Sequence, residues 1–284
     1  MSRLIAAIRG MSAKTCKGGV TCLHQSDGAE YGDAMVEALE LVWGSGFLSP
    51  GGPDEVARVV SGLDLEGAAI LDIGCGVGGI DFLLAQTHGA GEVIGVDVEA
   101  ANIERARIEA ARGGLSDRVH FQAVEPGAPL PFAAGRFDIV FSKDAIIHIP
   151  DKEALFGDIW RLLKPGGWFA ASDWLRGDDA PPSDEMRRYI EAEGLSFAMA
   201  SPQRYRKALA AAGFAQITIA DRNAWYARTA RAELAAINGP LRQRLIELVG
   251  KAEAARQTQV WERMLVVLDS GELRPIHLRG HKPG

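Results

Sequence analysis

From Ala69 to Trp174, short apolar runs alternate with stretches whose apolar residues have helical spacing. The apolar runs read AILDIG, EVIGVDV, VHFQAV, FDIVFSKD and WFAASDW. Such runs are typical of strands buried on both faces of a parallel sheet, and the stretches between them supply helical crossovers. With two later runs, AQITIADR and ELRPIHLRGHKP, the pattern predicts a doubly wound α/β fold with a mostly parallel, seven-stranded sheet.

The regions outside this alternation predict added helices. Residues 1–60 are expected to form an N-terminal helical arm with lid helices, and residues 61–284 are expected to form the core. A charged, helix-prone insertion at about 176–212 interrupts the alternation beside the sheet, where a lid is often found. The stretch that follows AQITIADR predicts further helices before the last strand.

Composition favours small-molecule chemistry. A net charge of −6 over 284 residues gives no basic footprint for nucleic acid. No apolar run approaches the ~18 residues of a membrane span, and the first residues lack a signal-peptide core. Cys16, Cys22 and Cys75 match no zinc or redox spacing. We therefore expect a cytoplasmic protein with a small-molecule substrate, no nucleic-acid or membrane partner, and no metal site.

A glycine-rich stretch lies where the first strand of the alternation gives way to a helix. In LDIGCGVGG, Gly74 and Gly76 lack a Cβ, so the turn can tighten and a ligand can lie against the backbone near the helix N-terminus. Asp97 follows about twenty residues later at the next strand tip, where an acid can accept both hydroxyls of a ribose. These residues predict a nucleotide-type cofactor but do not separate a nicotinamide from S-adenosylmethionine.

Two further motifs separate these cofactors. Asp72 precedes the glycines, and LLKPGGWF follows FDIVFSKDAIIHI. With these motifs, the stretch from Ala69 to Asp173 resembles a class I S-adenosylmethionine-dependent methyltransferase. The resemblance implies an enzyme that uses S-adenosyl-L-methionine. It implies cofactor contacts from Ser49, Asp72, Gly74, Gly76, Asp97, Val98, Glu125 and Lys143.

A more specific resemblance covers most of the chain. The stretches AEYGDAMVEALELVWGSGFLSPGG and FSKDAIIHI, with the C-terminal third, resemble the phosphoethanolamine N-methyltransferase group and related enzymes that methylate small amines and amino acids. This resemblance implies that the catalytic residues are Tyr31, Asp144 and His148. It implies substrate contacts from Trp174, Tyr189, Glu193, Tyr205 and Lys251.

One departure from this group bears on the substrate. Its members have an arginine that grips the substrate phosphate and a tyrosine two residues later, where this chain has Glu193 and Leu195. A carboxylate would repel a phosphate. We therefore expect methyl transfer to a small zwitterionic or cationic metabolite, preferably a free amino acid. S-methylation of methionine and N-methylation of a glycine derivative or amine both remain open.

Two alternatives remain at this level. The chain could be a true phosphoethanolamine N-methyltransferase that uses Lys143, Arg188 or Lys251 for the phosphate. It could instead belong to another class, as an NAD-dependent oxidoreductase or a non-catalytic nucleotide-binding module. A homodimer is possible if the last strand, GELRPIHLRGH, forms an edge of the sheet.

Overall fold

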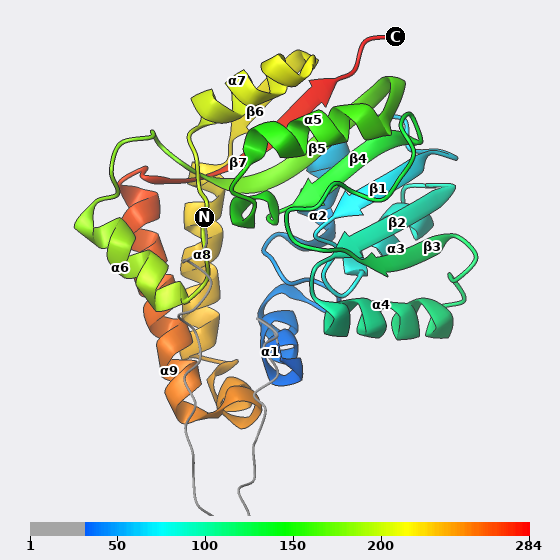
Figure 1. Cartoon of the computed structure of the whole chain (residues 1–284). Coiled ribbons are helices and arrows are strands. Elements are labelled where there is room, and N and C mark those ends of the chain that lie inside the picture. Colours follow the sequence, from blue (N-terminus) through cyan, green and yellow to red (C-terminus); the bar gives the residue numbers. More distant parts are fainter. Residues whose placement is uncertain (1–31) are drawn as a thin grey trace, which may run out of the picture.

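The computed structural model describes residues 32–284. Within them, seven strands form one sheet in the order β3-β2-β1-β4-β5-β7-β6 (Figure 1). The strands are β1 (Ala69–Ile73), β2 (Glu92–Asp97), β3 (Val119–Ala123), β4 (Phe137–Lys143), β5 (Leu163–Arg176), β6 (Ala215–Asp221) and β7 (Leu273–His281). The first five strands pair in parallel, while β7 is antiparallel to both of its neighbours. The predicted mostly parallel, seven-stranded sheet is confirmed.

The prediction that the last strand forms an edge is wrong. β7 lies between β5 and β6, and His277 is in register with Ser172 on one side and Ala220 on the other. The polar side chains that made this strand look like an edge bond to the helix below it: His277 Nε2 lies 2.7 Å from Glu55 Oε1, and Arg279 donates to the carbonyl of Val59. Both sides of β7 are therefore paired within the chain, so β7 offers no edge through which two copies could form a dimer.

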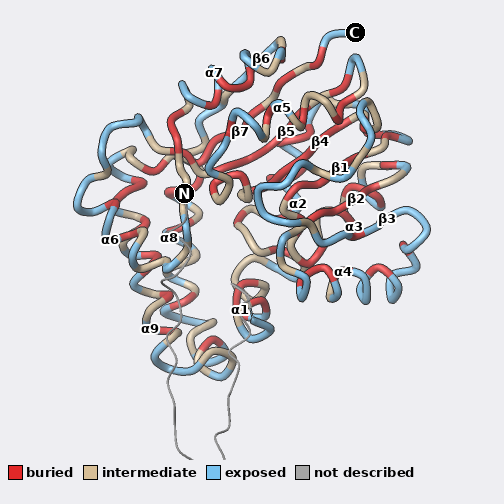
Figure 2. Tube along the Cα trace, in the orientation of Figure 1, coloured by how far each residue is buried: buried red, intermediate tan, exposed pale blue. Residues whose placement is uncertain are grey.

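Helices cover both faces of the sheet. One face carries α2 (Gly52–Val60), α3 (Gly79–Gln86) and α4 (Ala100–Arg112), whose apolar residues share a core with the inner strands. The other face carries α5 (Lys152–Leu162) and α7 (Pro202–Ala212). Figure 2 shows the buried positions concentrated along the strands between these layers. Although α7 belongs to the expected insertion, it packs on α5 as part of the core.

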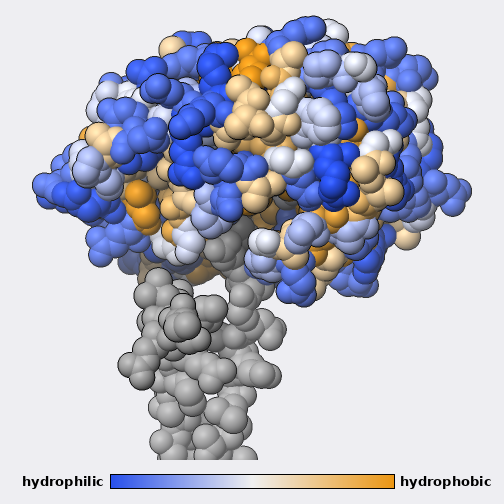
Figure 3. Space-filling view, turned by 45° about the horizontal axis from the view of Figure 1, so that its top comes forward, coloured by the Kyte–Doolittle hydropathy of each residue, from blue (hydrophilic) through white to orange (hydrophobic). Residues whose placement is uncertain are grey.

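Four more helices lie beside the carboxyl ends of the parallel strands (Figure 1). They are α1 (Asp33–Trp43), α6 (Asp184–Glu193), α8 (Asn223–Asn238) and α9 (Arg242–Asp269), which is kinked at Gly250. Their buried residues form a third core of their own, and we call this group the helical wall. The face of the molecule seen in Figure 3 is mostly hydrophilic. In residues 32–284, no helix has the length and apolarity needed to cross a membrane.

Candidate active site

The glycine loop between β1 and α3 has no room for a side chain at Gly74 or Gly76. Gly74 and Gly76 adopt φ angles of +80° and +54°, in the left-handed region that favours glycine. A Cβ on Gly74 would lie 2.1 Å from the Cβ of Ala145, and one on Gly76 would lie 3.0 Å from a methyl carbon of Leu48. The backbone of this loop is therefore bare and closely supported from behind.

Asp97, at the end of β2, braces this loop. Its Oδ2 accepts a hydrogen bond from the Gly76 N–H at 2.8 Å, and its Oδ1 accepts one from the Glu99 N–H at 2.9 Å. Burial raises the pKa of Asp97, and the two backbone donors oppose that rise. Each carboxylate oxygen still has a lone pair that could accept a ribose hydroxyl.

Two more carboxyl groups, Asp72 and Asp81, are buried near the loop. Both side chains are almost completely buried, and the two carboxyls lie close enough to share a hydrogen bond when one of them is protonated. Burial, and then the charge of Asp97, raises the pKa of Asp72; burial, and then Asp72, raises the pKa of Asp81. The raised pKa values favour protonated carboxyls, and a protonated carboxyl of this pair can donate a hydrogen bond to the other, which offsets the cost of burying both.

The end of β4 brings three predicted residues together. Lys143 Nζ donates to Ser49 Oγ at 2.7 Å and to Asp144 Oδ2 at 2.5 Å, and Ser172 Oγ donates to Asp144 Oδ1 at 2.9 Å. Asp144 has a φ of +59°, which is uncommon for a residue other than glycine. This backbone turn leads into the short helix η1 (Ile146–His148), which carries the next candidate.

His148 has a definite orientation. Its Nδ1 lies 3.1 Å from the carbonyl oxygen of Ser196. Because a carbonyl only accepts, Nδ1 carries the hydrogen, and in the neutral ring Nε2 is left with the free lone pair. The other two residues predicted to be catalytic are Tyr31 and Asp144. Tyr31 lies outside the described residues, and Asp144 bonds to the lysine and serine described above.

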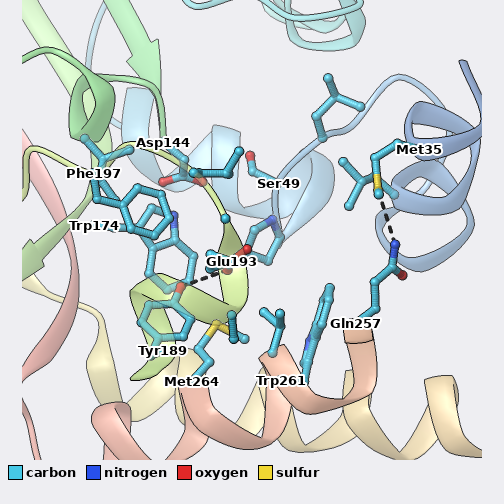
Figure 4. Close-up of a pocket in the computed structure, with 18 of the residues that line it drawn as sticks. Met35, Ser49, Asp144, Trp174, Tyr189, Glu193, Phe197, Gln257, Trp261 and Met264 are labelled. Atoms are coloured by element: carbon cyan, nitrogen blue, oxygen red, sulfur yellow. Dashed lines mark hydrogen bonds between the residues drawn. The ribbon is translucent and has the colours of Figure 1, made fainter. Parts of the chain in front are cut away.

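A cavity of about 530 Å³ lies between this strand end and the helical wall. Figure 4 shows Trp174, Tyr189 and Phe197 on one side of it, with Trp261 and Met264 projecting from α9. Its aromatic lining residues are Trp43, Trp174, Tyr189, Phe197, Tyr226 and Trp261. Its acidic lining residues are Asp144, Glu191 and Glu193. The cavity is therefore an aromatic chamber with carboxylates at its wall.

The charges of the cavity favour a cation. Glu193 Oε1 accepts a hydrogen bond from the Tyr189 hydroxyl at 3.0 Å, and burial raises the pKa of Glu193. Among the described lining residues, Arg256 is the one lysine or arginine. Its guanidinium donates to both carboxylate oxygens of Glu253 and to the carbonyl of Ala192 at 2.6 Å. That positive charge is already engaged.

Four other predicted residues lie elsewhere. Tyr205 is fully buried, and its hydroxyl donates to Asp173 at 2.5 Å in the core between α7 and the sheet. Lys251 is exposed just after the kink of α9. Neither residue lines the cavity, so the predicted substrate contacts of these two are not supported. Val98 and Glu125 are exposed just after β2 and β3, at the same carboxyl end of the sheet as the glycine loop.

Comparison with known proteins decides the family. The model of a methyltransferase domain matches residues 64–213, which is more than half of the chain. The chain belongs to the S-adenosylmethionine-dependent methyltransferases. The donor is S-adenosyl-L-methionine, and solved complexes with this compound or with S-adenosylhomocysteine share the fold.

Curated relatives of this methyltransferase include plant enzymes. It is 35% identical over 209 residues to phosphoethanolamine N-methyltransferase 1 of Triticum aestivum, covering 73% of this chain and 41% of that protein. It is 31% identical over 247 residues to phosphoethanolamine N-methyltransferase 3 of Arabidopsis thaliana, covering 87% of this chain and 49% of that protein. The chain thus spans less than half the length of these two relatives.

Two solved structures share the fold of the methyltransferase. One is phosphoethanolamine N-methyltransferase 2 of Haemonchus contortus with phosphomonomethylethanolamine and S-adenosylhomocysteine, with a TM-score of 0.81 at 23% identity, covering 91% of this chain and 60% of that one. The other is a putative sarcosine dimethylglycine methyltransferase from Galdieria sulphuraria, with a TM-score of 0.76 at 19% identity, covering 88% and 97%. At these identities the likeness shows the fold alone.

One residue of the methyltransferase was missed by sequence reasoning. Glu233 on α8 accepts hydrogen bonds from Trp43 Nε1 at 2.9 Å, Trp261 Nε1 at 3.0 Å and the Tyr226 hydroxyl at 3.1 Å. Tyr226 lies on the same helix as Glu233, Trp261 lies on the next helix, and Trp43 lies on α1, 190 residues away in sequence. No local motif signals a junction that includes so distant a residue.

Proposed function

We propose that this methyltransferase transfers a methyl group to a small cationic or zwitterionic metabolite without a phosphate, with nitrogen as the preferred acceptor atom. The observation that carries the proposal is the charge of the cavity beside the glycine loop. Its wall presents Glu193, which is bonded to a neutral hydroxyl, and Asp144, which is paired with Lys143. Its one described arginine, Arg256, is held by Glu253. An ammonium group fits these surroundings, whereas a phosphate would meet carboxylates.

The donor side of the proposal rests on the glycine loop. The backbone of Gly74 and Gly76 would approach the amino-acid end of the donor, Asp97 would accept the ribose hydroxyls, and Asp72 would face its cationic groups. When bound, S-adenosylmethionine supplies a methyl group on a sulfonium, which is already a good leaving group. The chain then has mainly to align the acceptor and exclude water.

On the acceptor side, an amine must lose its proton before or during the transfer. His148 Nε2 has the free lone pair that a general base requires, because Nδ1 is committed to the carbonyl of Ser196. Asp144, held by Lys143 and Ser172, would orient the amine without itself taking the proton. A bound acceptor would displace water from between the aromatic walls of this chamber.

Free amino acids belong to the proposed substrate class. Their carboxylate would compete with Glu253 for the guanidinium of Arg256, so we expect amines that lack a carboxylate to bind at least as well. Methionine would be methylated on its thioether, which has no proton to lose. For that substrate His148 would only position the acceptor and would not act as a base.

Phosphoethanolamine is the second candidate substrate. The observation that favours it is the 35% identity to the wheat enzyme of that name. Its phosphate would require Arg256 to leave Glu253, or a new conformation of an exposed cation such as Arg188 or Lys251. Phosphoethanolamine therefore requires a cation to move toward the cavity, whereas an amine without phosphate or carboxylate does not.

The experiment that decides between them is a panel assay. The enzyme is incubated with labelled donor and, separately, with ethanolamine, dimethylethanolamine, glycine, sarcosine, dimethylglycine, methionine and phosphoethanolamine, and products are identified by mass. We expect the highest kcat/KM for an acceptor without phosphate. A preference for phosphoethanolamine would overturn the proposal, and that activity should then depend on Arg256.

A further inference from the structure

Three aromatic residues that line the cavity donate hydrogen bonds to one carboxylate, that of Glu233. Trp43 comes from α1, Tyr226 from α8 and Trp261 from α9, and each directs its polar hydrogen at Glu233. Glu233 does not itself line the cavity. Because the N–H and O–H edges point away toward the carboxylate, the carbon surfaces of these residues are left to line the cavity.

The aromatic residues also contact one another around the chamber. The Trp43 and Trp261 rings have centroids 5.7 Å apart, and Trp174 meets Tyr226 edge-on at 4.6 Å. Such packing limits each ring to one orientation. Aromatic rings arranged around a cavity recognise methylated ammonium groups through cation–π attraction.

The bonding at Glu233 indicates that it acts as a carboxylate. All three of its partners donate, so its oxygens need no proton to satisfy them. Burial raises the pKa of Glu233 above its usual value, and the three donors limit that rise. Donation from an indole N–H to an anion increases the electron density of the ring, which strengthens attraction to a cation on the ring's carbon surface.

We propose that Trp43, Trp174, Tyr226 and Trp261 form a cage for the methyl-bearing ammonium of substrate or product, and that Glu233 is the positioning residue that orders and polarises it. This inference rests on the proposed function and specifies its substrate class as methylated amines. It also assigns selectivity to a residue that does not touch the ligand. The cage should therefore bind a cationic ligand more tightly than a neutral ligand of the same shape.

The test uses the full chain saturated with S-adenosylhomocysteine and two probes of nearly equal shape. Choline carries the ammonium, and 3,3-dimethylbutan-1-ol has a neutral carbon in its place. Calorimetry should show that choline binds at least tenfold more tightly. In Glu233→Gln, choline affinity should fall about tenfold while the alcohol changes less than twofold. Glu262→Gln, an exposed acid on α9, is the matched control and should change neither.

Two further variants keep the test decisive if Glu233→Gln does not fold. Trp43→Phe and Trp261→Phe each retain an aromatic ring but remove one donor to Glu233, and each should weaken choline about threefold. Equal binding of both probes by the unaltered protein would overturn the cage. An equal loss for both probes in a folded Glu233→Gln would make this residue a packing residue only. Failure of the panel assay with choline selectivity intact would instead overturn the proposed function alone.

Discussion

The two halves of the proposed active site, one for the donor and one for the acceptor, are built differently. The donor half is a single short stretch, the loop with Gly74 and Gly76 braced by Asp97 on the adjacent strand. The acceptor half is assembled from side chains of α1, α6, α8 and α9, which meet only in the folded chain. The first half depends on backbone shape, and the second depends on side-chain charge and aromatic packing. Mutations should therefore separate donor binding from acceptor binding.

The largest expected effect is on the donor half. Gly76→Val would force a branched side chain into a left-handed backbone and against Leu48, which would distort the loop expected to hold the donor. Affinity for S-adenosylhomocysteine should fall at least about 100-fold, or ~3 kcal/mol, in calorimetry. Gly166→Val is the control, because Gly166 also has a positive φ, +82°, but a Cβ there would extend into open space. Equal affinity in the two variants would contradict the loop assignment.

The second effect is on stability, at an ion-paired cluster that connects α2, β7 and the start of α8. Glu55 on α2 pairs with Arg222, which precedes α8, and with His277 on β7. Although burial raises it, hydrogen bonds from these two partners lower the pKa of Glu55 from 4.5 to about 2. A depressed pKa means that this stability is fully present above pH 4.5 and is lost as pH falls toward 2.

Glu55→Gln should therefore lower the free energy of unfolding by about 3 kcal/mol at pH 7. It should also remove part of the decline between pH 5 and pH 2. Denaturant titrations across that range measure both quantities, with Glu262→Gln as the exposed control. Unchanged stability at pH 7 would show that the bonds of Glu55 to Arg222 and His277 do not stabilise the fold.

The third prediction returns to donor binding. Asp97→Ala removes the acceptor for the Gly76 N–H and the expected partner of the ribose. Affinity for S-adenosylhomocysteine should fall by ~1–3 kcal/mol, with no change in choline binding measured at saturating donor product. Asp117→Ala, an exposed acid, should leave both unchanged. A loss of turnover without a loss of donor affinity would make the ribose assignment wrong.

The smallest effect is on the acceptor half. Glu193→Gln keeps an acceptor for the Tyr189 hydroxyl but removes the negative charge. For the preferred amine, kcat/KM should fall about fivefold, or ~1 kcal/mol, while donor affinity stays within twofold. Glu185→Gln, on the exposed side of α6, serves as the control. No difference between the two variants would show that Glu193 does not face the acceptor.

The same contrast explains what could be predicted from sequence. The parallel strands and the glycine loop follow from contiguous apolar runs and from residues that lie within one strand-turn-helix unit. The position of β7 could not be predicted, because its His277 and Arg279 resemble edge residues until α2 is packed against them. Glu233 was missed for a similar reason, because its partner Trp43 lies on α1, far in sequence from α8 and α9.

Some of the acceptor residues that the resemblance to known enzymes predicts line the cavity, and others do not. It led to Asp144 and Glu193, which the fold places at one cavity. It also suggested Tyr205, whose hydroxyl is instead used by Asp173 inside the core. A helix such as α7 can keep a family's aromatic residue while turning it toward the sheet, and one sequence does not show which face is buried.

The central claim is that the bare loop and Asp97 hold the donor with its sulfur toward the aromatic cavity. A crystal structure of the S-adenosylhomocysteine complex tests it most directly. We predict ribose hydroxyls on Asp97, the amino-acid end along Gly74 and Gly76, and the sulfur open to the chamber between Asp144 and His148. A nucleoside bound elsewhere, or a sulfur separated from that chamber, would contradict the account.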